Sequence, residues 1–555
     1  MKKNIFKKVL PLCAIAAGLG FTACTGDFES YNTDPNGIPT ENVPLESRFA
    51  QPIVSVYLNY QNMNWQYQLV QNLNADLYSG YMANPTAFGG NYCNSTYAMN
   101  EGWNNTAFEV GQMNIMKPIS LILASTQEPD YVAIAKIIRA EGMHRIVDIY
   151  GPVPFSKAMQ GGATVAYDDV ETLYKTFIAE LGESVDALTK FVDEGKADPD
   201  RIAFDKVCGR DHKQWIRFAN TLRLRLAMRI SVVEPALAIS TAEAAVNHKY
   251  GVLEAENPDV EVIDPNLQNP LNEINYAYGD IRMGASIMSI LQGYNDPRLP
   301  KYATPVGWFN DQDINDEKGN PAGYKGKYVG IRQGALVDKP QYQMYSTINM
   351  PKIKMTNLNG EGNQITNALP WMKVAESYFL RAEGVIRGWN MGGKTAQYFY
   401  EEGIKVSFNE YNIPNDAYQA YINDDKSVAA DYVDPHNTKN NSKGLDKMTI
   451  KWDEGASQED KLHRIINQKW LAMFPEGQEA WSEFRRTGYP KLFPVVNNFS
   501  GSVEGGIADG DFVKRLRFTR SEMNTNMPEV ENARKLLGGP DNEATRLWWD
   551  TGRNF

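Results

Sequence analysis

The sequence has few of the side chains that build disulfide scaffolds and metal centres. It holds four cysteines and five histidines among 555 residues. A cysteine-rich secreted scaffold is therefore excluded, and no histidines stand at the spacing that a zinc hydrolase requires. Nucleophile patterns such as G-x-S-x-G and S-x-x-K are also missing. His144 and Asp148 could orient a general base on a helix, but we interpret them as a structural side-chain pair.

Long apolar runs are missing as well, except at the N-terminus, where the run is too short to span a bilayer as a mature helix. Four lysines, at positions 2, 3, 7 and 8, precede an apolar stretch at 9–21 that leads into Thr22-Ala23-Cys24. This arrangement is typical of a bacterial lipoprotein signal, which is cleaved before a cysteine that then carries the acyl chains. An ordinary secretory signal with an unmodified Cys24 is the alternative.

The signal predicts how the chain is divided. We expect a signal peptide at 1–23, a lipidated tether at 24–45 and a single helical body at 46–555, with the lipid on Cys24 as its only membrane anchor. Cys13 leaves with the signal, so Cys93 and Cys208 remain in the body. They form either one disulfide or two buried free thiols.

The charge balance excludes nucleic-acid partners. The formal net charge is −11, and removing the four lysines of the signal makes it −15. A chain this acidic repels phosphate backbones, so we expect neither DNA nor RNA to bind. Nucleotides are scarce outside the cytoplasm, so no nucleotide ligand is expected either.

Helical periodicity recurs along the chain in pairs of segments. Residues 369–385 and 395–411 predict two helices joined by a glycine turn at 388–393, and Ala375, Ala382 and Gly403 allow them to approach closely. Further helices are expected at 131–150, 170–192, 213–231 and 460–486. A helix, a short turn and a helix within about forty residues is the pattern of a tetratricopeptide unit. The fold class is therefore mainly α, with long irregular, polar inserts near 251–351 and 411–452, where loop-borne function is expected.

The helix expected at 213–231 carries several arginines beside its apolar face. They could form an anion patch, but a solvated or ion-paired face is favoured in so acidic a chain. The arginines are Arg217, Arg223, Arg225 and Arg229.

Two motifs match the sequence patterns of ligand sites only superficially. Gly388–Thr395 fits the P-loop pattern, but that chemistry needs a strand before the glycines, and here a helix precedes them. We interpret it as an interhelical turn. Asp311, Asp313 and Asn315 resemble the start of an EF-hand loop, but Asp316 and Ala322 stand where glycine and glutamate are required. A looser calcium site in this acidic loop stays open, and no other cofactor or metal is expected.

Aromatic residues are abundant, and many lie in polar loops beside asparagine. Tyr, Trp and Phe make up 11% of the chain. Rings beside amide donors suit a sugar, whose C–H face stacks on a ring while its hydroxyls take hydrogen bonds. We expect the insert around Trp308 to have little core of its own. The candidate ligand-binding residues are Tyr81, Asn84, Tyr92, Trp103, Trp308, Tyr324, Tyr328 and Tyr342.

Several stretches, spread over nearly the whole chain, resemble the SusD/RagB family of surface lipoproteins. No single one is decisive, but their order together with the lipoprotein signal makes the match strong. They are Asn32–Asn36, Arg145–Phe155, Trp215–Arg229, Asp296–Leu299, Lys373–Gly384, Gln468–Trp470, Glu483–Pro490, Leu516–Thr519 and Leu547–Asp550.

This resemblance implies a helical scaffold of tetratricopeptide-like pairs with ligand-binding inserts. It also implies a lipid-anchored outer-membrane protein that faces the cell exterior, lies over a SusC-like TonB-dependent transporter, binds an oligosaccharide and performs no chemistry. Asp27 and Glu29 resemble the acidic surface-export signal of such lipoproteins. A peptide ligand, as in RagB-type members, is the alternative. A glycan-cleaving enzyme is less favoured: it needs two carboxylates about 5–10 Å apart across a cleft, and a sequence with many Asp and Glu cannot show such a pair. No binding residue is carried over from the family, because its ligand loops vary.

Overall fold

Amphipathic helices build most of the protein, because apolar residues recur at three- and four-residue spacing along the chain. The computed structural model describes residues 43–57, 64–264, 267, 269–306, 324, 326–337, 344–349, 368–501 and 506–555. The chain divides into two units, Met1–Arg48 and Phe49–Phe555. Most of the first unit, including Cys24 and the residues expected to be signal and tether, lies outside the described residues.

The N-terminal third begins with short helices and continues with longer ones. Its elements are η2 (Leu45–Phe49), α3 (Ala50–Val56), α4 (Asn64–Tyr67), η3 (Gln68–Asn72), α5 (Ala75–Tyr78), β1 (Met82–Ala83), η4 (Phe88–Asn91), η5 (Asn94–Thr96), α6 (Glu101–Asn104), α7 (Thr106–Val110), η6 (Gly111–Met116), α8 (Lys117–Ser125), α9 (Pro129–Tyr150) and α10 (Val170–Asp193).

The middle of the chain mixes long helices with short strands. Its elements are η7 (Pro199–Ile202), α11 (His212–Arg229), α12 (Pro235–Val246), β2 (Val260–Val262), α13 (Pro270–Glu273), η8 (Ile274–Tyr278), β3 (Arg282–Met283), α14 (Ala285–Gly293), α15 (Leu299–Tyr302) and β4 (Leu369–Met372). The structure therefore places helices at 270–302, within a stretch that the sequence pattern predicts to be irregular.

The C-terminal third is again helical, with an extended segment between its last two groups of helices. Its elements are α16 (Val374–Ile386), α17 (Ala396–Glu410), α18 (Asn415–Ile422), η11 (Thr438–Asn440), α19 (Gln458–Met473), α20 (Gly477–Thr487), α21 (Arg520–Thr525) and α22 (Met527–Lys535).

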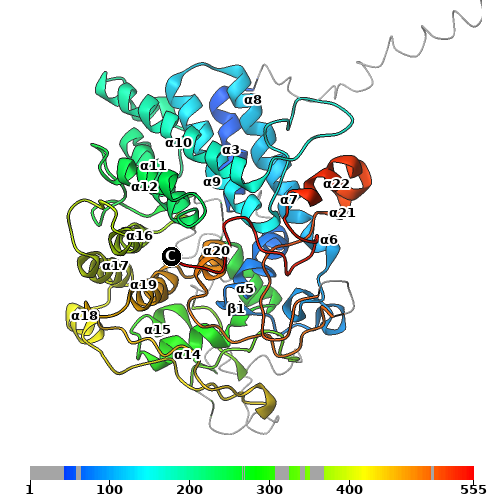
Figure 1. The fold of residues 1–555 in the computed structure, drawn as a ribbon, viewed down its shortest axis with the longest axis vertical. Coiled ribbons are helices and arrows are strands. Elements are labelled where there is room, and N and C mark those ends of the chain that lie inside the picture. The colour runs from blue at the N-terminus through cyan, green and yellow to red at the C-terminus, as the bar shows by residue number, and fades with distance from the viewer. Residues whose placement is uncertain are drawn as a thin grey trace, which may run out of the picture. The chain divides into compact units, whose positions relative to one another are not determined.

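The long helices pack as successive pairs. In the second unit α9 packs on α10, α10 on α11, α11 on α12 and α16 on α17, while α19 packs on α16 (Figure 1). Gly403 of α17 makes one of these approaches possible, since a Cβ there would lie 2.9 Å from Phe379 Cζ of α16. The mainly α fold of tetratricopeptide-like pairs is confirmed.

The helix predicted to begin at residue 369 begins later in the structure. Residues 369–372 form strand β4, which pairs antiparallel with β2, and helix α16 begins only at Val374. All four strand residues are buried, so their apolar run looks the same as the first turn of a buried helix. The partner strand, more than a hundred residues earlier in the chain, decides between the two.

The glycine turn between α16 and α17 is confirmed as an interhelical connection. Gly388, Gly392 and Gly393 all have positive φ, and the Thr395 side chain accepts from the Tyr398 N–H at 3.1 Å to cap α17. A helix, not a strand, precedes the glycines. The backbone arrangement of a P-loop is therefore absent from this turn.

Two strands connect the first loops of the unit to the middle insert. β1 pairs antiparallel with β3, with Met82 opposite Met283 and Ala83 opposite Arg282. Met283 also donates its N–H to Ser346 O and accepts from the Ile331 N–H, each at 2.9 Å. Strand β3 therefore hydrogen-bonds to β1 and also to residues of the middle insert, so it connects the insert to the loop that follows β1.

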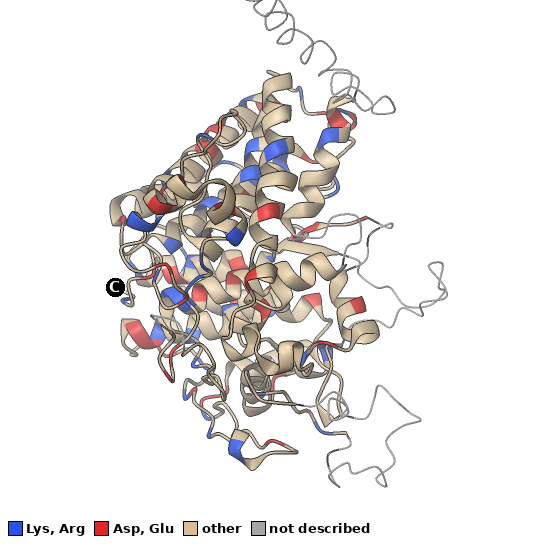
Figure 2. Cartoon of the chain, turned by 90° about the vertical axis from the view of Figure 1, so that its right-hand side faces the viewer, with Lys and Arg blue, Asp and Glu red and all other residues tan. Residues whose placement is uncertain are grey.

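Charged residues occur throughout the helical scaffold (Figure 2), and several of their side chains are buried. Arg229 of α11 donates to Glu479 at 2.5 Å and to Glu483 at 2.9 Å, and both glutamates belong to α20. Burial alone would raise the pKa of Glu483, but Arg486, Lys469 and Arg229 outweigh it and hold that pKa well below its usual value. The ion-paired alternative for the arginines of α11 therefore holds for Arg225 and Arg229, which are buried rather than solvated.

Other expectations concern thiols, histidine and membrane spans. Cys93 and Cys208 are buried free thiols.

His144 does not pair with Asp148: its Nδ1 lies 3.0 Å from Ala140 O, and Asp148 accepts from the Tyr174 hydroxyl at 2.5 Å. The structural pair predicted from their spacing is wrong, because each side chain finds a partner closer to it. None of the described helices combines the length and the apolar character that crossing a membrane requires.

Candidate ligand-binding surface

A tight turn after β1 presents the first aromatic loop. Gly89 and Gly90 have φ of +56° and +68°, a left-handed conformation that glycine adopts without steric cost. This turn, η4, places Phe88 at its start and Tyr92 directly after its end. Two rings four residues apart are thus held on one short, defined piece of backbone.

Each ring of this turn meets a second ring. Phe88 lies edge-to-face with Trp103, with centroids 5.2 Å apart and planes at 87°. Tyr92 stacks on Phe499 with centroids 5.0 Å apart and planes at 24°. Tyr92 is 65% exposed, so it offers a ring that is oriented by its partner and open to solvent. We call Phe88, Tyr92, Trp103 and Phe499 the aromatic surface.

Asparagines below the aromatic surface hold its loops together. The buried Asn94 amide donates to Asn74 Oδ1 at 2.6 Å and to Asn104 Oδ1 at 3.0 Å. The Asn100 side chain accepts from the Trp103 N–H and caps helix α6. These amides therefore orient the rings through the backbone. The half-buried Asn91 and Asn105 are the amides of this loop that lie nearer to solvent.

The middle insert reaches the same surface. The Gln333 side-chain amide donates to Ser95 O at 3.1 Å, while the Gln333 backbone carbonyl accepts from the Val496 N–H at 2.8 Å. The Phe499 N–H donates to Thr96 O at 2.8 Å. Gly334 has positive φ, and a Cβ there would collide with Val495, so only glycine permits this close approach. Three segments far apart in sequence thus meet behind the rings.

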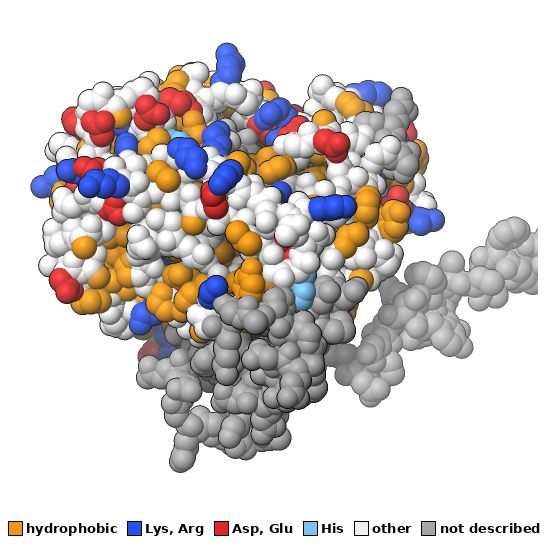
Figure 3. All heavy atoms as spheres, turned by 90° about the horizontal axis from the view of Figure 1, so that it is seen from below, with side chains coloured by type: hydrophobic (Ala, Val, Ile, Leu, Met, Phe, Trp, Pro, Cys, Tyr) orange, Lys and Arg blue, Asp and Glu red, His pale blue; other side chains and the backbone are white. Residues whose placement is uncertain are grey.

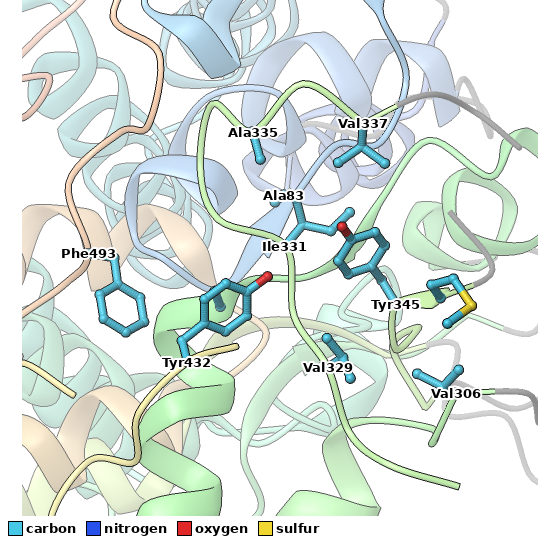
Figure 4. Packing of buried hydrophobic residues seen from close by; sticks show 11 residues of the cluster. Ala83, Val306, Val329, Ile331, Ala335, Val337, Tyr345, Tyr432 and Phe493 are labelled. Carbon is cyan, nitrogen blue, oxygen red and sulfur yellow. The ribbon is translucent and has the colours of Figure 1, made fainter. Parts of the chain in front are cut away.

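The described part of the insert has a core of its own, contrary to expectation. Tyr345 and Tyr432 point into a cluster of valines and isoleucine, with Ala83 of β1 on one side and Phe493 on another (Figure 4). Tyr432 donates to Gly330 O at 2.7 Å, and Tyr345 donates to Asp434 at 3.2 Å. The apolar residues of this core are scattered among polar neighbours in several segments that lie far apart in the sequence. The core therefore could not be predicted from a local pattern.

Two of the predicted site residues, Tyr92 and Trp103, lie in the aromatic surface. Tyr81 is elsewhere: it is fully buried between Trp470 and Phe474, and its hydroxyl donates to Trp470 O. A ligand could reach Tyr81 only if the packing of β1 on α19 opened. In this structure Tyr81 serves as a packing residue.

The other described candidates belong to the insert or to its border. Asn84 is 6% exposed and donates to Thr86 O at 2.9 Å. Tyr324 packs against the insert core, with Lys327 Nζ 5.1 Å from its ring centroid. Tyr328 is half-buried, and its carbonyl accepts from Gln292. Trp308 and Tyr342 lie outside the described residues, as do Asp311, Asp313 and Asn315 of the candidate calcium loop.

The sequence analysis missed two rings, the half-buried Phe499 and the exposed Trp65. Phe499 follows Asn497 and Asn498, and Trp65 stands between Asn64 and Gln66, which is the same ring-beside-amide pattern. Trp65 is 51% exposed. One turn further on, Gln68 donates to Asp280 at 3.0 Å, and Asp280 also accepts from Thr86 at 2.6 Å. Trp65 is therefore connected through one carboxylate to the loop that carries the aromatic surface.

No group of three or more histidine, cysteine or acidic side chains could hold a metal within the described ranges. The aromatic surface consists of four rings, and the Asn91 and Asn105 amides lie in the same loops. Rings can stack on a ring-shaped ligand, and amides can hydrogen-bond its polar groups.

The fold and this surface define a class: a scaffold of helix pairs whose long loops carry clustered aromatic side chains. A family model described as SusD-like, "Susd and RagB outer membrane lipoprotein", matches residues 29–550. The chain belongs to this family, as its sequence motifs suggested. Among curated proteins no relative matches the chain.

Solved structures of the family superimpose on nearly the whole chain. A chitin-binding SusD homolog from Flavobacterium johnsoniae is 40% identical with a TM-score of 0.83, over 92% of this chain and 100% of that one. A SusD homolog from Bacteroides vulgatus is 33% identical with a TM-score of 0.81, over 92% and 98%. A SusD-like protein from Bacteroides thetaiotaomicron is 32% identical with a TM-score of 0.79, over 92% and 99%.

Proposed function

We propose that this protein binds an oligosaccharide at the aromatic surface and passes it to a SusC-like TonB-dependent transporter in the outer membrane. The observation that carries the proposal is the stacked pair of Tyr92 and Phe499, with Tyr92 65% exposed beside the Phe88–Trp103 pair. Exposed rings with a fixed orientation are what a pyranose face requires. The chitin-binding homolog supports a glycan as the ligand class.

The affinity expected from such a surface is modest. One sugar face stacked on one ring removes about 50 Å² of apolar surface from water, which contributes about 1.2 kcal/mol. Three or four rings acting together, less the entropy of ordering a flexible sugar, give roughly micromolar to millimolar affinity. That range suits a carrier that must release its ligand, and tethering beside a transporter compensates by raising the effective concentration.

The proposal places the protein on the outer membrane by its lipid, facing the cell exterior, with no catalytic step. The family description as an outer membrane lipoprotein supports the location. On the visible described part of the face in Figure 3, positive and negative side chains are scattered among hydrophobic atoms. No large area of one charge is visible on that face.

A peptide ligand is the second candidate within the same architecture. A peptide would bind mainly through backbone hydrogen bonds along an exposed edge, and aromatic rings would matter less. The two candidates therefore differ in their sensitivity to loss of a ring.

The test is calorimetric titration of the mature protein, without its signal, with a chitin hexasaccharide, a maltohexaose and a mixture of short peptides. Tyr92→Ala should weaken binding of the glycan about five- to tenfold, which is the loss of one stacked ring. Tyr398→Ala is the matched control, because Tyr398 is 42% exposed but lies on α17, outside the aromatic surface.

The outcomes separate the hypotheses. Glycan binding that falls in Tyr92→Ala and stays unchanged in Tyr398→Ala supports the proposal. Binding of peptides alone moves the ligand to the peptide class. Release of reducing sugar after long incubation would show an enzyme.

A further inference from the structure

A cavity lies at the end of helix α20, lined by different residues from those of the aromatic surface. It has a volume of about 740 Å³, within the range of about 300–1,000 Å³ that small-molecule sites occupy. Its walls carry five cationic side chains, of Arg485, Arg486, Lys491, Lys514 and Arg546, and one carboxylate, of Glu459.

Arg485 is the deepest of these cations. Its side chain is 2% exposed and lies against the Trp481 ring, 3.6 Å from the ring centroid. Its guanidinium donates to three backbone carbonyls, those of Asp148 at 2.6 Å, Lys514 at 2.7 Å and Trp481 at 3.4 Å, and to Ser482 Oγ at 3.0 Å. A guanidinium has five N–H donors, so one is left over after these four bonds.

No carboxylate of the described chain pairs with Arg485, since all its partners are neutral oxygens. Burial lowers the pKa of Arg485 to about 10, although the carboxylates of Asp148 and Asp550 act in the opposite direction from further away. A buried cation with neutral partners is costly, and an anion placed in the adjoining cavity would offset part of that cost.

Lys491 is the second cation without a carboxylate. Its ammonium donates to Gly488 O at 3.1 Å, lies 4.3 Å from the Tyr489 ring centroid and forms no ion pair within the described part of the chain. Two of its three donors are thereby available to a ligand.

The remaining charges of the cavity are paired. Arg486 binds Glu383 and Glu483, Arg546 binds Asp550, and Lys514 Nζ lies 3.3 Å from Asp511. Glu459 is held at the rim, where it accepts from the Tyr489 hydroxyl at 2.7 Å and from the Asn554 amide at 2.6 Å. The unpaired charge in the walls is therefore that of Arg485 and Lys491, opposed by one hydrogen-bonded carboxylate.

The cavity also offers apolar surface beside its cations. Phe484 and Phe512 line it as an edge-to-face pair with centroids 4.8 Å apart, and Tyr489 lines it as well. Cations next to rings suit a ligand with a charged group on a small ring or chain, rather than a bare hydrated ion.

We propose that this cavity is a binding site for an oxyanion, a carboxylate or a sulfate, carried by a small ligand such as an acidic monosaccharide. Arg485 and Lys491 supply the charge-assisted hydrogen bonds, and the rings supply the contact surface. The site is separate from the aromatic surface, although both lie along one stretch of chain: Lys491 and Phe499 are eight residues apart, at most about 28 Å when extended.

The experiment titrates the mature protein calorimetrically with sodium glucuronate and, separately, with sodium sulfate, in a buffer of low ionic strength where screening is weak. Glucose is the neutral control for glucuronate. We expect glucuronate or sulfate to bind and glucose not to bind. Lys491→Gln should weaken that binding at least fivefold, whereas Lys190→Gln, whose side chain is 78% exposed on α10, should leave it unchanged.

Arg485→Lys is a second variant, which keeps the charge but loses the planar fork, and its fold is checked by circular dichroism. A folded Arg485→Lys variant should bind glucuronate more weakly than the wild type. Failure of both anions to bind at millimolar concentration, or equal affinities of Lys491→Gln and Lys190→Gln, overturns the proposal. Binding of the chitin hexasaccharide by Lys491→Gln at wild-type strength shows that the two sites are independent.

Discussion

Arg225 of α11 and Glu376 of α16 form a two-bonded ion pair inside the protein, with N–O distances of 2.9 and 2.7 Å. Both side chains are at most 2% exposed. Lys469 of α19 lies 3.3 Å from the same glutamate. One carboxylate thus joins three helices of the scaffold, and the charges inside it are compensated by one another rather than by water.

Removal of that carboxylate should destabilise the fold strongly. Glu376→Ala removes the two shortest ion-pair contacts of the buried Arg225 and one carboxylate near the buried Lys469, and breaking a buried pair in this way costs about 3–5 kcal/mol of unfolding free energy. Urea denaturation of the mature protein at pH 7 measures it. Glu194→Ala, which breaks exposed pairs with Lys190 and Lys196, is the control and should change stability little. Equal effects of the two variants would contradict the role given to the buried pair.

Glu141 should make stability depend on pH in the opposite direction from most carboxylates. Burial raises its pKa to about 8, because the nearby Arg225 and Arg145 only partly offset the loss of water. The folded state therefore keeps a proton on Glu141 that the unfolded state releases once the pH exceeds 4.5, the ordinary pKa of a glutamate. Through this group the free energy of unfolding falls as pH rises from about 5 to about 8.

Glu141→Gln removes this titration, so the variant should gain stability relative to the wild type between about pH 5 and pH 8. Denaturation series at several pH values, with Glu171→Gln on an exposed side chain as the baseline, give the comparison. A difference between Glu141→Gln and wild type that stays constant over this range would show that Glu141 does not titrate there.

Trp103→Ala should weaken glycan binding about five- to tenfold, since it removes one ring contact and the edge on which Phe88 rests. The fold should remain intact, because Trp103 is only half-buried. Trp308→Ala is expected to have the same effect, on the sequence pattern alone, since Trp308 lies outside the described residues. Calorimetry with the chitin hexasaccharide measures the affinity of both variants, and circular dichroism checks their fold. Unchanged affinity in both would show that neither ring contacts the glycan.

Lys394→Ala should leave the protein almost unchanged. Lys394 lies in the turn before α17 with its Nζ 5.3 Å from the Tyr398 ring centroid, and exposed substitutions of this kind usually change stability by less than about 0.5 kcal/mol. Thermal unfolding measures that change. Calorimetric binding of ATP that disappears in this variant would instead restore the P-loop interpretation.

Cys24→Ala should release the protein from the membrane fraction, because the lipid is expected to be its only anchor. Cell fractionation with metabolic palmitate labelling, in a strain that lacks the adjacent transporter, is the measurement. A variant that remains in the membrane without palmitate would refute the lipid anchor.

The long helices could be predicted from the sequence because their signal is local. Apolar residues three and four apart marked α9, α10, α11 and α17 within a few residues of their ends. Strand β4 could not be predicted in this way, since its buried residues need β2 as a partner before they differ from a helix. The buried pairing of Arg225 also depends on a helix about 150 residues away.

The aromatic surface was predictable only in part. By itself the sequence determined the helical class and the presence of rings beside amides in the loops, and it predicts the lipoprotein signal, because composition and short spacings express these features. The tertiary structure alone decided that Tyr92 is exposed while Tyr81, eleven residues earlier, is buried against Trp470. It also decided that Phe499 stacks on Tyr92. Exposure and stacking depend on which distant segments pack over a residue, and that packing is not encoded in any local pattern.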